Sequence, residues 1–307
     1  MALTTSNVKQ TSVSRFFEGL SAVPDKWRKV VDFRNTDTAS LRIASLTGIG
    51  DVPTWDGGGA TPDAGITAAA IDSTGASTLT YQGYAVQVKL NKYDIKDIPE
   101  ITALTAQKLG QAVAEKYRKL AFTQLAGFTS TAAGFATADG KALAANDHTM
   151  TSGTRDNLLT TALSRTAIMA AIKQLRQFKN YQQQFTSFAD GALLLVVPPE
   201  LEQTAIEIIH SGFSGGVDSN ASTMQMNAVS MFNIEIVVDP YMSDANDWVL
   251  MTADNANSPI KFWERSSPDF SLTEIKQDTR QLLMTVDFAV ATANGPQPDG
   301  FIGGAVS

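Results

Sequence analysis

The spacing of apolar residues predicts a long helix in the middle of the chain, over residues 98–126. Along this segment apolar side chains recur on one side at helical spacing, and Lys, Arg, Gln and Glu fall mostly elsewhere. Asp97 and Glu100 have the spacing of a capping box, Pro99 suits a first helical turn, and Gly127 suits a helix end. Such a helix would be roughly 40 Å long at 1.5 Å per residue and would act as a structural spine.

Shorter apolar runs predict further helices and strands after the spine. A second helix is expected over about residues 157–182, and a third opens at Pro198-Pro199-Glu200 and ends before Gly212. Residues 193–197 form a continuous aliphatic run, which is typical of a short buried strand, and residues 282–290 alternate apolar with polar positions. Further strand candidates are residues 234–238, 248–251 and 260–263. The pattern therefore predicts an α+β protein whose last third is rich in strands.

The first 92 residues have a different pattern. Helical periodicity is weak and limited to about residues 16–31, so this part cannot build a core of its own. Turn-forming residues cluster at Trp55-Asp56-Gly57-Gly58-Gly59 and at Thr74-Gly75, and residues 79–90 alternate like a strand. We expect a long, exposed β-hairpin or loop. Because an isolated two-stranded ribbon is marginal in water, it should rest on another element or on another subunit.

Charge divides this region into two complementary segments. Residues 1–42 hold seven Lys and Arg against four acids, a net charge of +3, whereas residues 43–88 hold four Asp and neither Lys nor Arg. Contacts between such segments of different subunits would align an assembly as much as stabilise it. The four acids are Asp51, Asp56, Asp63 and Asp72.

The composition of the 307 residues, 43% hydrophobic and 18% charged, is that of a chain able to bury a core. A net charge of −7 argues against a dedicated nucleic-acid binder, because neutralising phosphates requires clustered positive charge. No apolar run approaches the ~20 residues of a membrane-spanning helix, and no secretory signal pattern opens the chain, so we expect a cytoplasmic protein. The absence of Cys excludes disulfides and cysteine nucleophiles.

One sequence pattern suggests a hydrolase. Gly212-Phe213-Ser214-Gly215-Gly216 matches the G-x-S-x-G form of a nucleophile elbow, and His210 is close in sequence. An elbow requires a strand before the serine and a helix after it, but a helix is predicted before Ser214 and a polar segment after it. A flexible glycine loop is therefore the favoured interpretation.

A second pattern suggests a metal site. Asp139, Asp147 and His148 carry oxygen and nitrogen atoms that suit several divalent ions. The other histidine, His210, is distant in sequence, and no H-E-x-x-H spacing exists. We therefore favour a histidine that caps a turn.

Two further patterns are weaker. Residues 134–141 resemble a phosphate-binding loop, but five residues separate the two glycines where the motif has four, and Ala142 stands where Ser or Thr would hold magnesium. Acids on the third predicted helix are expected to form a solvated face. These acids are Glu200, Glu202 and Glu207. No cofactor is indicated.

Five aromatic residues could form a ligand platform, although packing in cores and interfaces is the commoner use of such side chains. They are Trp55, Tyr81, Tyr84, Trp248 and Trp263. A Trp between turns on an exposed loop needs apolar cover, which favours a subunit interface for Trp55. The predicted interface set is Trp55, Asp56, Asp63, Asp72, Tyr81 and Tyr84.

The order of these elements resembles that of a tailed-bacteriophage major capsid protein of the Hong Kong 97 fold. A basic N-terminal arm precedes an acidic hairpin, a spine helix, a mixed central region and a returning β-region. The resemblance covers nearly the whole chain and is closest to the Mu-type major head subunit family. It departs from that family after Trp55, where basic positions are replaced by glycines. The motifs that carry it are Tyr93-Asp94-Ile95-Lys96-Asp97, Gly127-Phe128, Asp139-Gly140-Lys141-Ala142-Leu143, Asp147-His148, and residues 195–202 and 234–240.

This resemblance implies a division of the chain and a set of partners. Residues 1–45 would be the N-terminal arm and 46–92 the extended loop. Residues 93–151 and 257–307 would form the peripheral domain, and 152–256 the axial domain. The implied protein is not an enzyme but a major capsid protein, assembled in the bacterial host cytoplasm as hexamers and pentamers of an icosahedral virion head.

The same resemblance implies partners beyond the subunit itself. A separate scaffold protein and a portal are expected, a decoration protein is a further candidate, and packaged double-stranded DNA would be contacted non-specifically. Because residues 43–88 contain no Lys, no isopeptide cross-link from this loop is expected.

Three alternatives remain open. An encapsulin-type nanocompartment shell uses the same fold, and a domesticated prophage head would look identical in sequence. A serine hydrolase using Ser214 and His210 predicts a soluble monomer with measurable turnover. A phage tail or surface-binding module would be built from β-structure, which the two long predicted helices fit poorly.

Overall fold

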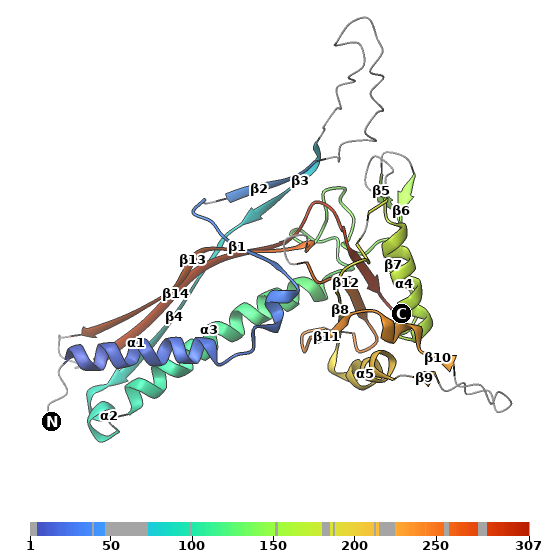
Figure 1. The fold of residues 1–307 in the computed structure, drawn as a ribbon. Helices are drawn as coiled ribbons and strands as arrows, with labels where there is room; N and C mark the ends of the chain where they lie inside the picture. The colour runs from blue at the N-terminus through green and yellow to red at the C-terminus, as the bar shows by residue number, and fades with distance from the viewer. Residues whose placement is uncertain are drawn as a thin grey trace, which may run out of the picture.

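The computed structural model describes residues 5–38, 40–46, 73–98, 100–150, 153–179, 185–186, 188–211, 213–214, 225–242, 244–254, 258–275 and 281–306. Two parts are joined along one continuous chain (Figure 1). An elongated part combines the helices α1 and α3 with a long antiparallel sheet, and a more compact part is built on a second sheet. Among the helices of the described ranges, none is long and apolar enough to cross a membrane.

The predicted spine is present as α3 (Ile101–Ala126), 26 residues long. It begins three residues later than expected, because residues 92–97 form a separate short helix, α2 (Lys92–Asp97). Glu100 occupies the N-cap position without a side-chain cap, so the predicted capping box at Asp97 is wrong. The helix ends at Gly127, as predicted. Its buried face consists of Thr102, Ala106, Leu109, Gly110, Val113, Ala114, Tyr117, Ala121, Phe122, Gln124 and Leu125.

The N-terminal segment completes this core. Its helix, α1 (Thr5–Ser21), lies along α3, and a 3-10 helix, η1 (Asp25–Lys29), follows it. The two long helices approach closely at glycines: a Cβ added to Gly110 would lie 2.1 Å from the carbonyl oxygen of Phe16, and one added to Gly19 would lie 2.1 Å from that of Gln107. Phe16, Trp27 and the valines after it are buried in the main core. The arm thus obtains from α3 the core that it cannot form alone.

A four-stranded sheet lies against the spine, in the order β1-β13-β14-β4. Its strands are β1 (Asp32–Asn35), β13 (Ile260–Ile275), β14 (Gln281–Asn294) and β4 (Gln82–Asn91). Only β1 joins parallel to its neighbour. The alternation predicted for residues 282–290 is confirmed, because Met284, Val286, Phe288 and Val290 face the core.

The hairpin begins in the described ranges as β2 (Ser40–Leu46), which pairs antiparallel with β3 (Ser73–Thr80). Figure 1 shows this pair beside the four-stranded sheet and continuing away from it. The single strand expected over residues 79–90 is divided at Tyr81 into β3 and β4. Leu79 is buried in a small cluster with Trp263, Ala291 and Ala293, which ties the hairpin to the sheet.

The compact part is built on a five-stranded sheet in the order β11-β8-β12-β15-β7. Its strands are β11 (Ile234–Val238), β8 (Leu193–Val197), β12 (Trp248–Thr252), β15 (Phe301–Gly304) and β7 (Leu158–Leu159). Both faces of β8 are covered: Leu194 and Val196 join the main core, while the alternate residues join a second core against α4 and α5. Cover on both faces explains the continuous aliphatic run.

Two expectations change in this part. The helix predicted over residues 157–182 is shorter, α4 (Arg165–Gln177), because Ser164 caps it by accepting from the Ala167 amide at 3.1 Å and residues 158–159 form β7 instead. The strand β15 lies in residues 257–307, which the resemblance assigned to the peripheral domain, but it pairs with β12 in the sheet of the central segment. The third helix is present as η2 (Pro199–Leu201) followed by α5 (Glu202–His210). Shorter elements are β5 (His148–Thr149), β6 (Thr154–Arg155), β9 (Phe213–Ser214), β10 (Gln225–Met226) and η3 (Ala228–Met231).

Candidate functional site

Two of the residues predicted at a subunit interface, Tyr81 and Tyr84, lie between β3 and β4 and within β4, respectively. The ring of Tyr84 stacks on Phe288 with centroids 5.3 Å apart, and the Lys116 ammonium lies 4.6 Å from its centroid. Its hydroxyl donates to Oε1 of Gln82 at 2.8 Å. Tyr81 packs against the small cluster that contains Trp263. Burial raises the pKa of both phenols, so both hydroxyls remain protonated at physiological pH.

The other four predicted interface residues, Trp55, Asp56, Asp63 and Asp72, lie outside the described residues. Their role at an interface therefore stays a prediction. The two remaining tryptophans of the aromatic set are buried, Trp248 at 0% exposed and Trp263 at 8% exposed, in agreement with the packing role favoured for them.

The arm is fastened to the rest of the subunit by ion pairs. The carboxylate of Asp32, in β1, accepts from Lys261 Nζ at 2.9 Å and from Arg34 Nε at 2.8 Å, and Asp32 is 3% exposed. Lys29 Nζ lies 2.7 and 2.8 Å from the carboxylate oxygens of Glu235, at the surface of β11. Asp32 and Lys261 are 229 positions apart, so no local motif could have revealed them. We call these contacts of Lys29 and Asp32 the clamp. They hold the N-terminal segment against both sheets.

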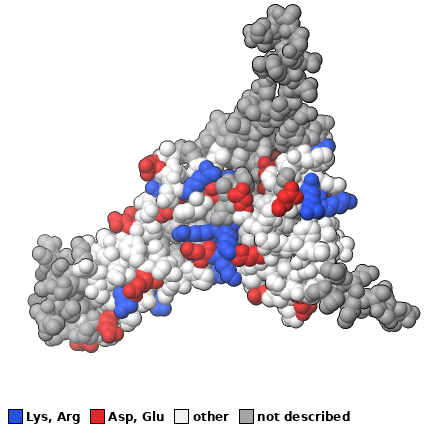
Figure 2. Space-filling view, viewed as in Figure 1, with Lys and Arg blue, Asp and Glu red and all other residues white. Residues whose placement is uncertain are grey.

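Acidic and basic side chains are interspersed over the face drawn in Figure 2. The blue and red groups near its centre lie side by side rather than in separate fields of one sign. Mixed surfaces of this kind do not create the extended positive potential of a dedicated nucleic-acid binder.

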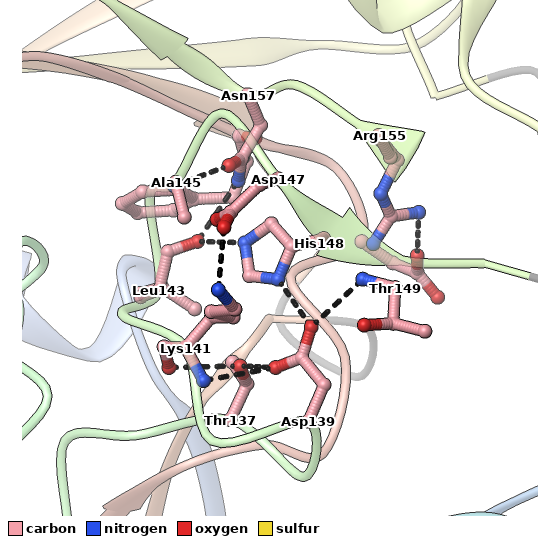
Figure 3. Close-up of polar contacts among 12 residues, drawn as sticks. Thr137, Asp139, Lys141, Leu143, Ala145, Asp147, His148, Thr149, Arg155 and Asn157 are labelled. Carbon is pink, nitrogen blue, oxygen red and sulfur yellow. Dashed lines mark hydrogen bonds and ion pairs between the residues drawn. The ribbon is translucent and has the colours of Figure 1, made fainter. Parts of the chain in front are cut away.

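Among the described residues, a well-connected polar cluster lies in the segment after the spine, around the partly buried Asp139 and the buried His148 (Figure 3). Asp139 accepts four hydrogen bonds, from Thr137 Oγ1 at 2.5 Å, His148 Nδ1 at 2.9 Å, the Lys141 amide at 3.1 Å and the Thr149 amide at 3.2 Å. Burial alone would raise the pKa of Asp139, but the hydrogen bonds and charge of His148, together with the other donors, hold it well below the ordinary value.

The other nitrogen of His148 also faces an acceptor. Its Nε2 lies 3.3 Å from the carbonyl oxygen of Leu143, which also accepts from Asn157 Nδ2 at 2.9 Å. Asn157 in turn accepts from the Ala145 amide at 2.8 Å, and Lys141 forms an ion pair with Asp147 at the surface.

This geometry indicates that the Asp139–His148 cluster holds the segment of residues 137–149 in place and does not form a catalytic dyad. The nitrogen that would take a proton from a nucleophile is directed at a main-chain carbonyl, and the hydroxyl of Thr137 is used on Asp139 and on the Lys141 carbonyl. The described ranges contain no group of three or more His, Asp or Glu placed to hold a metal ion. The turn-capping interpretation of His148 is therefore the one the contacts favour.

The G-x-S-x-G segment lacks the context of a nucleophile elbow. The helix α5 ends at His210, four residues before Ser214, and Ser214 lies in the two-residue strand β9, which pairs with β10. A helix before the serine contradicts the strand-turn-helix requirement, as the sequence pattern predicted. The acids Glu200, Glu202 and Glu207 are exposed, which agrees with a solvated face.

One buried acid was missed by the sequence analysis. Asp239 follows β11 and is 0% exposed; its Oδ1 accepts from the Tyr241 amide at 2.7 Å, and its Oδ2 has no hydrogen-bond partner. Burial raises the pKa of this carboxyl to about 7. The sequence Asp239-Pro240 after a strand signals a turn but gives no sign of burial.

A protein-family model described as phage capsid protein matches residues 71–302 of the chain. A search of curated proteins gave no match. The fold is similar to that of several solved capsid structures. Their sequence identity to this chain is low, so this similarity supports the assignment of the fold and nothing beyond it.

Three of these structures illustrate the similarity. The mature capsid of bacteriophage PhiM1 is 10% identical, with a TM-score of 0.58 over 93% of this chain and 88% of that one. The procapsid of bacteriophage JBD30 is 14% identical, with a TM-score of 0.52 over 99% and 77%. A virus-like particle from Pyrococcus furiosus is 10% identical, with a TM-score of 0.55 over 97% and 98%. The chain therefore has a Hong Kong 97-type capsid fold.

Proposed function

Because this chain belongs to the phage capsid protein family, we propose that it is the major head subunit of a tailed phage. Many copies would form hexamers and pentamers and close an icosahedral shell around double-stranded DNA. The observation that carries this proposal is the family match, which extends over residues 71–302, from the start of β3 into β15. The correspondence of nearly the whole chain with subunits of a capsid and a procapsid supports it.

The finer assignments are also proposals. We place the subunit in the Mu-type group on the order of its short motifs, and we keep the division into arm, extended loop, peripheral domain and axial domain, with β15 moved to the axial sheet. In this scheme the acidic segment between β2 and β3 lies across a neighbouring subunit and buries surface that a lone hairpin cannot bury, while β4 stays in the sheet of its own subunit. Its charge of −4 would meet basic surface there.

The proposed partners follow from this role. They are other copies of the chain, a separate scaffold protein, a portal, and a decoration protein as a further candidate. DNA would be confined within the shell with little specific contact, since the subunit carries a net charge of −7. Assembly would occur in the bacterial cytoplasm, and we assign no catalytic step to the protein.

A second candidate function is a cellular nanocompartment shell. It is favoured by the similarity to the virus-like particle from Pyrococcus furiosus, which extends over 97% of this chain and 98% of that one. The two candidates differ in cargo and not in fold. Nuclease-protected DNA of uniform length inside particles from the native host would support the phage head, and enclosed protein without DNA would support the compartment.

The experiment that tests the shared proposal uses the chain expressed alone in a bacterium. Size-exclusion chromatography and negative-stain electron microscopy should give closed shells, or capsomer rings that close when a scaffold protein is added. A monodisperse monomer that stays monomeric with scaffold present would contradict it. That outcome would make a hydrolase screen with Ser214→Ala the next step.

A further inference from the structure

A cavity of about 240 Å³ lies between the arm, the spine and β13. Aromatic rings of Phe17, Trp27 and Tyr117 line it, together with three charged residues, Asp25, Arg28 and Glu264. The volume is below the usual 300–1,000 Å³ of small-molecule sites and is closer to that of one long side chain. Neither the clamp nor the Asp139–His148 cluster uses this cavity.

Glu264 contributes a buried carboxylate to the wall of the cavity. It is 6% exposed, and its Oε1 accepts a hydrogen bond from the Tyr117 hydroxyl at 2.9 Å. Burial and the negative charge of Glu264 raise the pKa of Tyr117, which therefore stays a neutral donor. Within the described residues no basic side chain lies within ion-pair distance of this carboxylate, whose side-chain hydrogen bond there comes from the Tyr117 hydroxyl. A buried carboxylate held only by a neutral phenol is unfavourable until a cation matches it.

The basic residue already in the lining is engaged elsewhere. The guanidinium of Arg28 lies 5.4 Å from the centroid of Trp27 and 5.0 Å from that of Phe33, and its Nε lies 3.7 Å from Asp25. Arg28 is about half exposed, so its charge is shared with Asp25 and water. The three charges of the lining sum to −1, and the excess belongs to the buried Glu264.

A cation among aromatic rings gains further stabilisation from their electron-rich faces. A basic side chain would place its apolar stem against Phe17 and Trp27 and its charged end at Glu264. We propose that this cavity accepts the lysine side chain of a protein partner. Charge complementarity and size select this occupant over an acidic side chain or a larger cofactor.

The test uses the full-length protein and ligand-observed saturation-transfer NMR, which works whether or not the chain is assembled. The probe is N-acetyl-lysine N-methylamide, and the matched probe is N-acetyl-norleucine N-methylamide, which has the same stem without the ammonium. The lysine probe should bind with a Kd in the millimolar range, at least tenfold more tightly than norleucine. Equal binding of the two probes, or no binding of either, would overturn the proposal.

Substitutions locate the binding. Glu264→Gln removes the charge but leaves an oxygen for the Tyr117 hydroxyl, and it should weaken lysine binding at least tenfold. Ala114→Leu fills the cavity from the helix side and should abolish binding with the helical circular dichroism unchanged, which covers the case in which Glu264→Gln fails to fold. Glu115→Gln, a half-exposed residue of α3 that is paired with Arg118 and is not part of the cavity lining, is the control and should bind as the wild type does. Unchanged lysine binding in either cavity variant would contradict the assignment. Shell formation is measured separately, so the two proposals fail independently.

Discussion

At the scale of single residues, Asp139 is partly buried and Asp239 is fully buried, and the pKa values of the two carboxyls shift in opposite directions. Asp139 is surrounded by donors, so its ionised form is stabilised and its pKa falls. Asp239 has an amide on one oxygen and no partner on the other, so burial dominates and its pKa rises to about 7. The number of donors that reach each carboxylate decides the sign.

The raised pKa of Asp239 makes the subunit less stable as the pH rises. The folded state binds a proton between the ordinary pKa of 3.8 and about 7, so the contribution of this group is fully present below 3.8 and is lost as the pH rises through 7. We expect Asp239→Asn to remove a decline of about 2 kcal/mol between pH 5 and pH 8. Urea unfolding of both proteins across that range measures it. Parallel pH profiles for the two proteins would contradict the assignment.

The lowered pKa of Asp139 has the opposite effect on the pH dependence of stability. Its contribution is present above the ordinary pKa of 3.8 and is lost as the pH falls toward the lower folded value. Asp139→Asn should cost about 2 kcal/mol at pH 7, because four donors lose their charged acceptor, and the deficit should shrink in acid. Asp147→Asn is the control, since its ion pair with Lys141 is exposed and should contribute little to stability. Equal losses of stability in the two variants would show that the Asp139–His148 cluster contributes no more than an exposed ion pair.

At the scale of elements, the sequence predicted helices and strands correctly where a single hydrophobic periodicity extends over the segment. Residues 193–197 and 282–290 were predicted as strands, and the spine ends at Gly127, because burial on fixed faces imposes a regular pattern. The predicted cap at Asp97 failed because residues 92–97 form their own helix. The helix predicted from residue 157 failed because Leu158 and Leu159 pair with a strand some 145 positions away, at Gly303 and Gly304. No local period reports a pairing so distant in sequence.

The packing of α1 on α3 depends on the absence of a side chain at Gly110. A Cβ there would lie 2.1 Å from the Phe16 carbonyl oxygen and 2.7 Å from the Leu20 amide nitrogen, both of them backbone atoms that a rotamer change cannot move. Gly110→Ala should therefore separate the helices and cost about 2 kcal/mol, although alanine favours helices. Thermal unfolding measures the loss. Gly191→Ala, where a Cβ meets nothing within 4 Å, is the control, and an equal unfolding temperature for the two variants would contradict this account.

At the scale of the whole molecule, the sequence predicted the architecture better than the contacts. The order of arm, hairpin, spine and sheets could be inferred from pattern and charge. The clamp of Asp32 with Lys261 and the carboxylate of Glu264 could not, because each contact joins residues more than 140 positions apart. The subunit interface lies further out of reach, since its surfaces meet only in the assembly.

The acidic loop offers a direct test of assembly. Trp55 is predicted to gain apolar cover from a neighbouring subunit, so Trp55→Ser should leave the unfolding temperature of the subunit unchanged and reduce the yield of closed shells at least several-fold. Size-exclusion chromatography with electron microscopy measures the yield. Full yield in the variant would show that Trp55 is not at an interface.

Cryo-electron microscopy of the particles formed by the full-length chain tests the central claim most directly. We expect a closed shell of hexamers and pentamers in which α3 and the four-stranded sheet form the periphery of each capsomer, and in which the acidic segment between β2 and β3 lies on a neighbouring subunit. Open tubes, isolated trimers or a folded monomer under all assembly conditions would contradict it.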